Sequence, residues 1–188
     1  MNFLKSFFTK SNPSLDGSNI LLSVLNLTNP TTHGTDISPS DTAAILISPN
    51  DDVFFSEFSR STKDLLKNSS LYSNIKHRTH TDHHGTIWII FTCKQFKDLV
   101  SAVDYVSSAI SDKGFGERMI AAIFKGSFEN HNSYWICNYR TSAFYPFIPQ
   151  GKQSRLNETE IKLGDIFKKH GLKVEPQEKW FAIWEAPF

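Results

Sequence analysis

The stretch SYWICNYRTSAFYPFIPQGKQSRLN (Ser133–Asn157) contains two apolar runs separated by the polar turn formers Asn138–Ser142. Two such runs around a turn predict consecutive β-strands. The second run, Ala143–Pro149, combines three aromatic residues with two prolines. Because Pro146 has no N–H to donate, its strand is expected to lie at the edge of a sheet or to end there. An aromatic residue before proline also favours a cis peptide bond at Tyr145–Pro146.

Two further elements are predicted after this stretch. Asn157 followed by Glu160 resembles a capping box, which predicts a helix that runs to about His170 and is closed by Gly171. The alternating side chains of Trp180–Trp184 predict a last β-strand. One face of that strand is expected to carry Trp180, Ala182 and Trp184.

Two hairpins are predicted upstream. Arg118–Phe128 and Ser133–Arg140 are strand-like runs on either side of a short polar turn. Ser73–Thr81 and Thr86–Cys93 flank the turn sequence Asp82–Gly85 in the same way. The second strand of this earlier hairpin is apolar on both faces, so it is expected to be a central strand.

The longest amphipathic segment, Lys94–Lys113, predicts a helix that ends at Gly114. Its apolar stripe consists of Phe96, Leu99, Val100, Val103, Val106 and Ile110. Upstream of the first hairpin the sequence predicts a helix at 18–28, a loop at 29–41, a strand at Ala43–Ser48 and a helix at about Asp52–Lys67.

Hairpins separated by single helices indicate an α+β fold. The predicted architecture has two layers: a mostly antiparallel β-sheet with helices packed on one side. At 188 residues the chain is expected to form a single domain, 1–188. A short amphipathic segment at 1–15 and the loop at 29–41 are expected to lie outside its regular elements.

The composition excludes several functional classes. A hydrophobic share of 39% and an aromatic share of 13% predict a globular core. Twenty Lys and Arg against 19 Asp and Glu give a net charge of +1, which argues against nucleic acid as a partner and against strong capture by an anionic membrane. Cys93 and Cys137 are expected to be reduced, because the sequence lacks the pattern of a signal peptide and favours a cytoplasmic location.

The N-terminal segment Met1–Lys10 has two interpretations. Its residues Phe3, Leu4, Phe7 and Phe8 recur at helical spacing. The segment could be a short helix that covers the core, or a short amphipathic anchor that makes a weak, peripheral contact with a membrane surface. The sequence leaves both interpretations open.

A group of histidines marks the first hairpin. His77, His80, His83 and His84 are close in sequence, and imidazole is a common ligand of zinc and copper. Two of them, His77 and His80, differ by three positions on a strand, so they are expected to point to opposite faces. The spacing therefore argues against a metal site, although a metal-binding or enzymatic module centred on this hairpin remains the alternative.

No catalytic constellation is recognisable. The sequence contains no GxSxG, HExxH or phosphate-binding loop, and Gly114–Glu117 follows a predicted helix, whereas a phosphate loop follows a strand. The acidic pairs Asp51–Asp52 and Glu158 with Glu160 are expected at helix starts, where the helix dipole accounts for them. We therefore expect a protein that is not an enzyme and that has no cofactor.

Four segments resemble the PspA-associated protein PspAB family. The rest of the chain agrees with the family only in outline, and it departs from it in the histidine-rich hairpin and at Glu185, where the family pattern has glycine. The segments are GFGERMIAAIF (Gly114–Phe124), YRTSAFYPFIP (Tyr139–Pro149), SRLNETEIKL (Ser154–Leu163) and KVEPQEKWFAIWEAPF (Lys173–Phe188).

The resemblance implies an accessory protein of a phage-shock-like membrane stress response. Such proteins are encoded beside PspA-like effectors and HtpX-like membrane proteases, so one of these is the expected protein partner. The resemblance implies no catalytic residues. Partner contact is expected on an aromatic edge, because exposed aromatic side chains anchor interfaces. The expected contact residues are Tyr139, Arg140, Phe144, Tyr145, Pro146, Phe147, Trp180 and Trp184. For the aromatic rings of Tyr139, Phe144, Tyr145 and Phe147, packing in the core is the default alternative.

Overall fold

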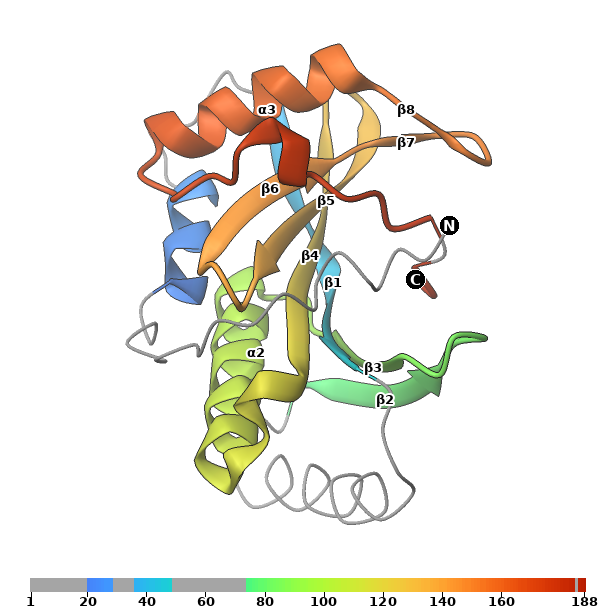
Figure 1. Cartoon of the computed structure of the whole chain (residues 1–188). Coiled ribbons are helices and arrows are strands. Elements are labelled where there is room, and N and C mark those ends of the chain that lie inside the picture. Colours follow the sequence, from blue (N-terminus) through green and yellow to red (C-terminus); the bar gives the residue numbers. More distant parts are fainter. Residues whose placement is uncertain (1–19, 29–35, 49–73, 185) are drawn as a thin grey trace.

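A computed structural model of the chain describes residues 20–28, 36–48, 74–184 and 186–188. Its centre is a six-stranded sheet in the order β2-β3-β1-β4-β5-β6 (Figure 1), and every neighbouring pair of strands is antiparallel. The α+β class is therefore confirmed. The strands of the sheet are β1 (Ile37–Ile47), β2 (Lys76–Thr81), β3 (Ile87–Thr92), β4 (Met119–Phe128), β5 (His131–Asn138) and β6 (Ala143–Phe147).

Three longer helical elements accompany the sheet: the 3-10 helix η2 (Leu21–Thr28) and the α-helices α2 (Phe96–Ile110) and α3 (Asn157–Lys169). A small antiparallel ladder joins β6 to α3. The shorter elements are the π-helical turn η5 (Ser111–Phe115), the 3-10 turns η6 (Gly116–Arg118) and η7 (Gln177–Lys179), and the strands β7 (Pro149–Gln150) and β8 (Ser154–Arg155).

The interior strands are apolar on both faces because both faces of the sheet are covered. In β1, Ile45 faces one apolar cluster and Leu46 faces the other. In β3, Ile89 and Ile90 divide in the same way, and β3 lies between β2 and β1. The prediction that β3 is an inner strand is confirmed.

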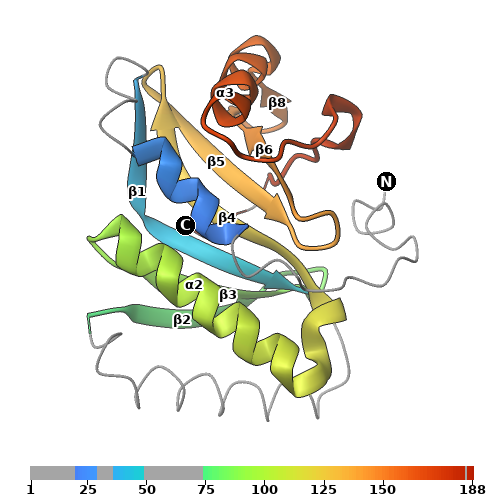
Figure 2. The same ribbon diagram turned by 90° about the vertical axis from the view of Figure 1, so that its left-hand side faces the viewer.

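One face of the sheet, the helix face, is covered by helices. In Figure 2, α2 and η2 lie across the sheet on the side toward the viewer. The buried stripe of α2 includes Leu99, Val103 and Val106, and α3 adds Phe167 to the same apolar cluster. Within it, the fully buried ring of Trp135 lies edge-on, 6.3 Å from the ring of Phe167. The predicted helices on one side of the sheet are thus present.

The opposite face, the strap face, is covered by an irregular segment, residues 180–188, which we call the C-terminal strap. Ile183 is buried there, and Trp180, Phe181 and Phe188 pack against the cluster that includes Leu46. The predicted strand at 180–184 is wrong, because the segment has no strand structure. Its backbone crosses the side chains of the sheet, so it cannot join a backbone ladder at an edge.

Two local predictions are also wrong. The loop predicted at 29–41 overlaps β1, which begins at Ile37 because that residue pairs with Phe128 of β4. No described peptide bond is cis, so the bond at Tyr145–Pro146 is trans. Both residues lie in β6 opposite β5, and the ladder requires the longer spacing of a trans peptide.

Other boundaries agree with the sequence. Both hairpins and the α2 helix are present, and Gly114 and Gly171 have φ values of 82° and 81°, as expected for residues that end helices. Pro146 lies in β6, which is an edge strand of the sheet.

The predicted segment at 1–15 and the helix at about 52–67 fall outside the described residues. In the part of the chain that is described, no helix is long and apolar enough to cross a bilayer.

Candidate interaction site

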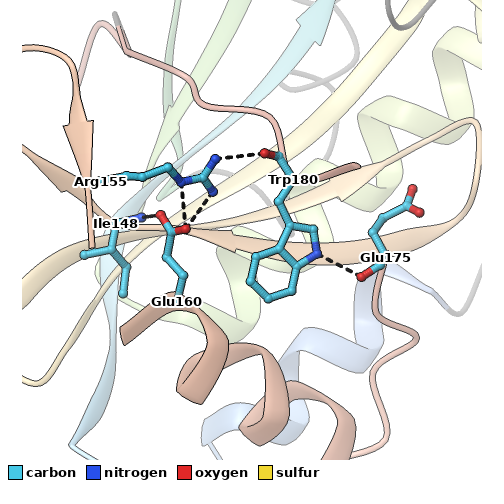
Figure 3. A network of polar contacts seen from close by, with 5 residues as sticks. All are labelled: Ile148, Arg155, Glu160, Glu175 and Trp180. Carbon is cyan, nitrogen blue, oxygen red and sulfur yellow. Dashed lines mark hydrogen bonds and ion pairs between the residues drawn. The ribbon is translucent and has the colours of Figure 1, made fainter. Parts of the chain in front are cut away.

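A buried ion pair lies at the start of the C-terminal strap (Figure 3). The Nε and Nη2 atoms of Arg155 each lie 2.7 Å from Oε2 of Glu160, whose side chain is 2% exposed. The other carboxylate oxygen accepts the backbone N–H of Ile148 at 2.7 Å. Burial raises the pKa of Glu160, and the hydrogen bonds from Arg155 and Ile148 offset part of this rise. The pair joins β8 and α3 to the end of β6.

Glu160 therefore has a different role from the predicted one. The residue that precedes the helix, Leu156, makes no side-chain cap. Glu160 instead turns inward on the same side of α3 as Leu163 and Phe167, three and seven positions later. A glutamate within an apolar stripe at helical spacing is the sequence signal that identifies it as buried, and the capping-box interpretation obscured that signal.

Trp180, the first residue of the strap, is held through its backbone and its ring. Its carbonyl oxygen accepts a hydrogen bond from Nη1 of Arg155 at 2.8 Å, and its indole Nε1 donates to the carbonyl of Glu175 at 2.8 Å (Figure 3). The ring lies against Gly164 of α3, where a Cβ atom would come within 2.6 Å of it. Glycine is required by this close approach.

Glu175 connects the segment before the strap to the β5–β6 turn. Its buried Oε1 accepts hydrogen bonds from the side chains of Asn138, at 3.4 Å, and Thr141. Its backbone N–H donates to the carbonyl of Phe144 at 2.8 Å, and the N–H of Phe144 donates to Lys173 at 2.7 Å. The outer side of β6 is thus paired at Phe144 with a segment of the same chain.

The far end of the strap rests on aromatic rings of three strands. Trp184 lies edge-on to Phe147 of β6, with ring centroids 5.1 Å apart. Phe188 lies edge-on to Tyr134 of β5 at 6.1 Å and to Trp88 of β3 at 6.0 Å. On β2, Nη2 of Arg78 donates to the carbonyl of Pro187 at 2.7 Å. The strap therefore reaches from β6 to β2.

The residues predicted to contact a partner have very different exposures. Phe144, Tyr145 and Phe147 are fully buried, so the expectation that these rings are exposed is wrong. Their strand is covered by α3 on one face and by the strap on the other. Tyr139 and Pro146 are also buried, whereas Arg140 and Trp180 are half-buried and Trp184 is 40% exposed.

The structure thus brings Phe147 and Trp184 together and leaves Trp184 as the most exposed ring of the predicted set. That these residues bind a partner stays a prediction. Sequence reasoning missed the residues that position the strap, namely Arg155, Glu160, Gly164 and Glu175. Their roles depend on contacts between distant segments.

The buried side chains that could act as nucleophiles are two cysteines and two tyrosines. Cys93 and Cys137 are both free and buried. Burial raises the pKa of the Cys137 thiol, and the neighbouring Glu175 raises it further. Burial likewise raises the pKa of Tyr139 and of Tyr145. The Cys137 thiol and the Tyr139 and Tyr145 hydroxyls therefore stay protonated at neutral pH, which is unsuited to nucleophilic chemistry.

The histidines of the β2–β3 hairpin do not converge. His83 and His84 are exposed turn residues with ring centroids 3.8 Å apart, while His77 and His80 lie on β2. The adjacent carboxylate of Asp82 accepts hydrogen bonds from two backbone N–H groups of the turn and from the indole of β3. Among the described residues, no three His, Cys, Asp or Glu side chains are grouped to hold a metal ion.

A protein-family model described as PspAB, PspA associated protein B, matches residues 1–188. The chain belongs to the PspAB family. No curated protein and no solved structure matches it. The match includes the N-terminal half, where the sequence motifs agreed with the family only in outline, and it includes the residues that hold the strap. Membership in PspAB associates the chain with PspA and its stress response.

Proposed function

We propose that this PspAB protein is a non-enzymatic accessory protein that binds a PspA-like protein in a phage-shock-like response to envelope stress. The observation that carries the proposal is the match to the PspA associated protein B family over residues 1–188. The proposed location is cytoplasmic. An HtpX-like membrane protease is the second candidate partner, because the sequence resemblance implies it.

The strap is the part of the surface best suited to this contact. Trp184 is 40% exposed at its centre, and the half-buried rings of Trp180, Tyr134 and Phe188 lie along the same face. Partly exposed aromatic rings on a rigid support are typical anchors of protein interfaces. The support here consists of the Arg155–Glu160 pair and the ring contacts with the sheet.

A binding measurement with purified proteins tests the proposal. The full chain is titrated with the PspA-like protein of the same organism in a calorimeter, and in parallel with the HtpX-like protease in detergent. Trp184→Ala is expected to weaken binding about tenfold or more, because truncation of an aromatic anchor removes well over 1 kcal/mol. The matched control is Tyr105→Ala, which removes a ring that is 37% exposed on α2, over the opposite face.

If the wild-type chain binds neither protein, the proposed function is wrong. Equal losses in the two variants would instead place the contact away from the strap. Two earlier alternatives have tests of their own. Metal analysis of untagged protein tests a module at His77–His84, and vesicle flotation of a chain lacking residues 1–10 tests the peripheral membrane contact.

A further inference from the structure

The two edge strands of the sheet, β6 and β2, differ in whether another segment of the described chain pairs with their outer side. At β6, the backbone of Phe144 pairs with residues 173–175 through two hydrogen bonds and a parallel bridge to Val174. Pro146 of the same strand has no N–H to offer. At the other end of the sheet, no described strand lies beyond β2. The chain therefore closes the β6 edge with its own residues, and in its described part it leaves the β2 edge open.

The hydrogen bonds of the hairpin reveal which backbone groups of β2 point outward. The N–H of Asp82 donates to the carbonyl of Thr86 at 3.0 Å, so Asp82 directs its N–H toward the strand β3. Because the direction of the backbone groups alternates along an antiparallel strand, Arg78 and His80 also direct their backbone groups toward β3. The N–H and C=O groups of the residue between them, Thr79, point away from the sheet.

The side chains of this edge are exposed and basic. Lys76 and Arg78 alternate along one face of β2, with His80 after them, and all three are exposed. The segment Lys76–Thr81 contains no acidic residue. The carboxylate of Asp82, which directly follows β2, accepts three hydrogen bonds within the hairpin. Among the described residues no carboxylate forms an ion pair with Lys76 or Arg78, so an extended segment placed alongside β2 would meet their positive charge.

We propose that β2 is a docking edge that binds an extended acidic segment of a partner protein as an additional β-strand of the sheet. Main-chain hydrogen bonds to the outward groups of β2 supply the attachment, and carboxylates at alternate positions pair with Lys76 and Arg78. The same charges disfavour pairing with a second copy of β2, because two basic strands repel each other. Charge thus selects an acidic strand over an identical one.

This site lies beside the strap, whose Pro187 carbonyl accepts a hydrogen bond from Arg78, but it does not use the proposed anchor Trp184. Its basis is the backbone direction at Thr79 and the charge of β2, and neither depends on Trp184. The two proposals can fail independently. Trp184→Ala is expected to leave the edge site unchanged, and changes at Thr79 are expected to leave the ring of Trp184 in place.

The probe is a synthetic peptide of alternating Glu and Thr, compared with a matched peptide of alternating Lys and Thr. Each is titrated to millimolar concentration into the isotope-labelled full chain, and backbone amide shifts are followed by NMR. The Glu peptide is expected to produce saturable shifts along β2 and β3 and none in α2. The Lys peptide is expected to produce none, because like charges repel.

Two variants separate backbone pairing from charge. Thr79→Pro removes an outward N–H without removing a bond to β3, so the Glu peptide is expected to bind about tenfold more weakly or not at all. Its control, Thr79→Val, keeps the N–H and a branched side chain, and binding is expected to persist. Lys76→Glu is expected to weaken binding about two- to fivefold, the effect of one cross-strand charge pair.

Several results would overturn the edge site. These are equal binding of the two peptides, full binding by Thr79→Pro, and shifts confined to the strap. Concentration-dependent shifts at β2 without peptide would also overturn it, because they would assign the edge to a second copy of the chain. The α2 amides of each variant report whether it is folded, and Lys76→Glu tests the charge requirement if Thr79→Pro is not.

Discussion

The helix face of the sheet is covered by elements that satisfy their own backbone hydrogen bonds, whereas the strap face is covered by a segment that does not. Within α2 each N–H finds a carbonyl one turn away. The strap has no helix or strand in its described part, so its carbonyls at Trp180, Pro187 and Phe188 accept bonds from the side chains of Arg155, Arg78 and Tyr134. Its attachment depends on a few side chains from distant strands.

This difference predicts two levels of stability. The helix face contains fully buried apolar side chains from α2, α3 and five strands of the sheet, and its opening amounts to unfolding the protein. The strap buries mainly Ile183, and its other described apolar residues are partly exposed. Segments of the second kind open locally with free energies below the global value. The following predictions test that ranking.

The largest effect is expected on the helix face. Trp135→Ala removes a ring with no exposed surface that lies edge-on to Phe96 and Phe167 and donates a hydrogen bond to Ser133 at 3.0 Å. A cavity of this size costs about 3–5 kcal/mol. Urea unfolding followed by circular dichroism should show that loss in a single transition. A loss as small as that of Trp184→Ala would contradict the ranking of the two faces.

A somewhat smaller effect is expected at the junction of strap and sheet. Arg155→Ala leaves the carboxylate of Glu160 buried without its partner and removes the donor to the carbonyl of Trp180. Loss of one partner of a buried pair costs several kcal/mol, and about 2–4 kcal/mol is expected here because the Arg155 side chain is 20% exposed. Hydrogen exchange should accelerate in residues 180–188 more than in α2.

The control for this variant is a second ion pair of the same chain. Lys168 lies 3.1 Å from Asp165 on α3, and both side chains are more than half exposed. Lys168→Ala should change the unfolding free energy by less than about 1 kcal/mol, as is usual for surface pairs. Equal losses in the two variants would mean that the Arg155–Glu160 pair has no special role in holding the strap.

The sequence predicts the helix face better than the strap face because the former follows simple periodicity. The spacing of Leu99, Val103 and Val106 indicates which side of α2 is buried, and alternation in β3 indicates an inner strand. Both patterns depend only on local geometry. The predicted strands and helices of this half of the structure are accordingly present, apart from their exact ends.

The strap face was predicted incorrectly because its pattern is not local. The run 180–184 is apolar and alternating, which is typical of a strand, yet it crosses a sheet whose edges are already defined. Whether Phe147 is exposed or covered depends on Trp184, thirty-seven positions later. Likewise, Glu160 fits both a capping box and a buried ion pair, and only the position of Arg155 decides between them.

The variant Gly164→Ala tests how closely α3 and the strap must approach each other. Gly164→Ala places a Cβ where the ring of Trp180 lies, at 2.6 Å. The ring must shift, and overpacking of this kind costs about 1–3 kcal/mol, although alanine favours the helix itself. Unfolding should be measured together with tryptophan fluorescence. Gly114→Ala is not a suitable control because its φ is 82°, so Glu158→Ala, on the exposed first turn of α3, serves instead.

The smallest effect is expected from the titration of Glu160. Burial raises its pKa in the folded chain, so the folded state binds a proton more tightly than the unfolded state does. The contribution of Glu160 protonation to the free energy of unfolding is therefore complete below the ordinary carboxyl pKa. It is lost as the pH rises through the raised pKa of the folded state. Burial also raises the pKa of Asp104. Its effect on the unfolding free energy is the same in wild type and in Glu160→Gln, so it cancels in the difference between them. The unfolding free energy of wild type minus that of Glu160→Gln should therefore fall as the pH increases across this window. A difference that rises with pH would mean that the bonds from Arg155 and Ile148 outweigh burial, and that the strap is held by a net favourable charge pair.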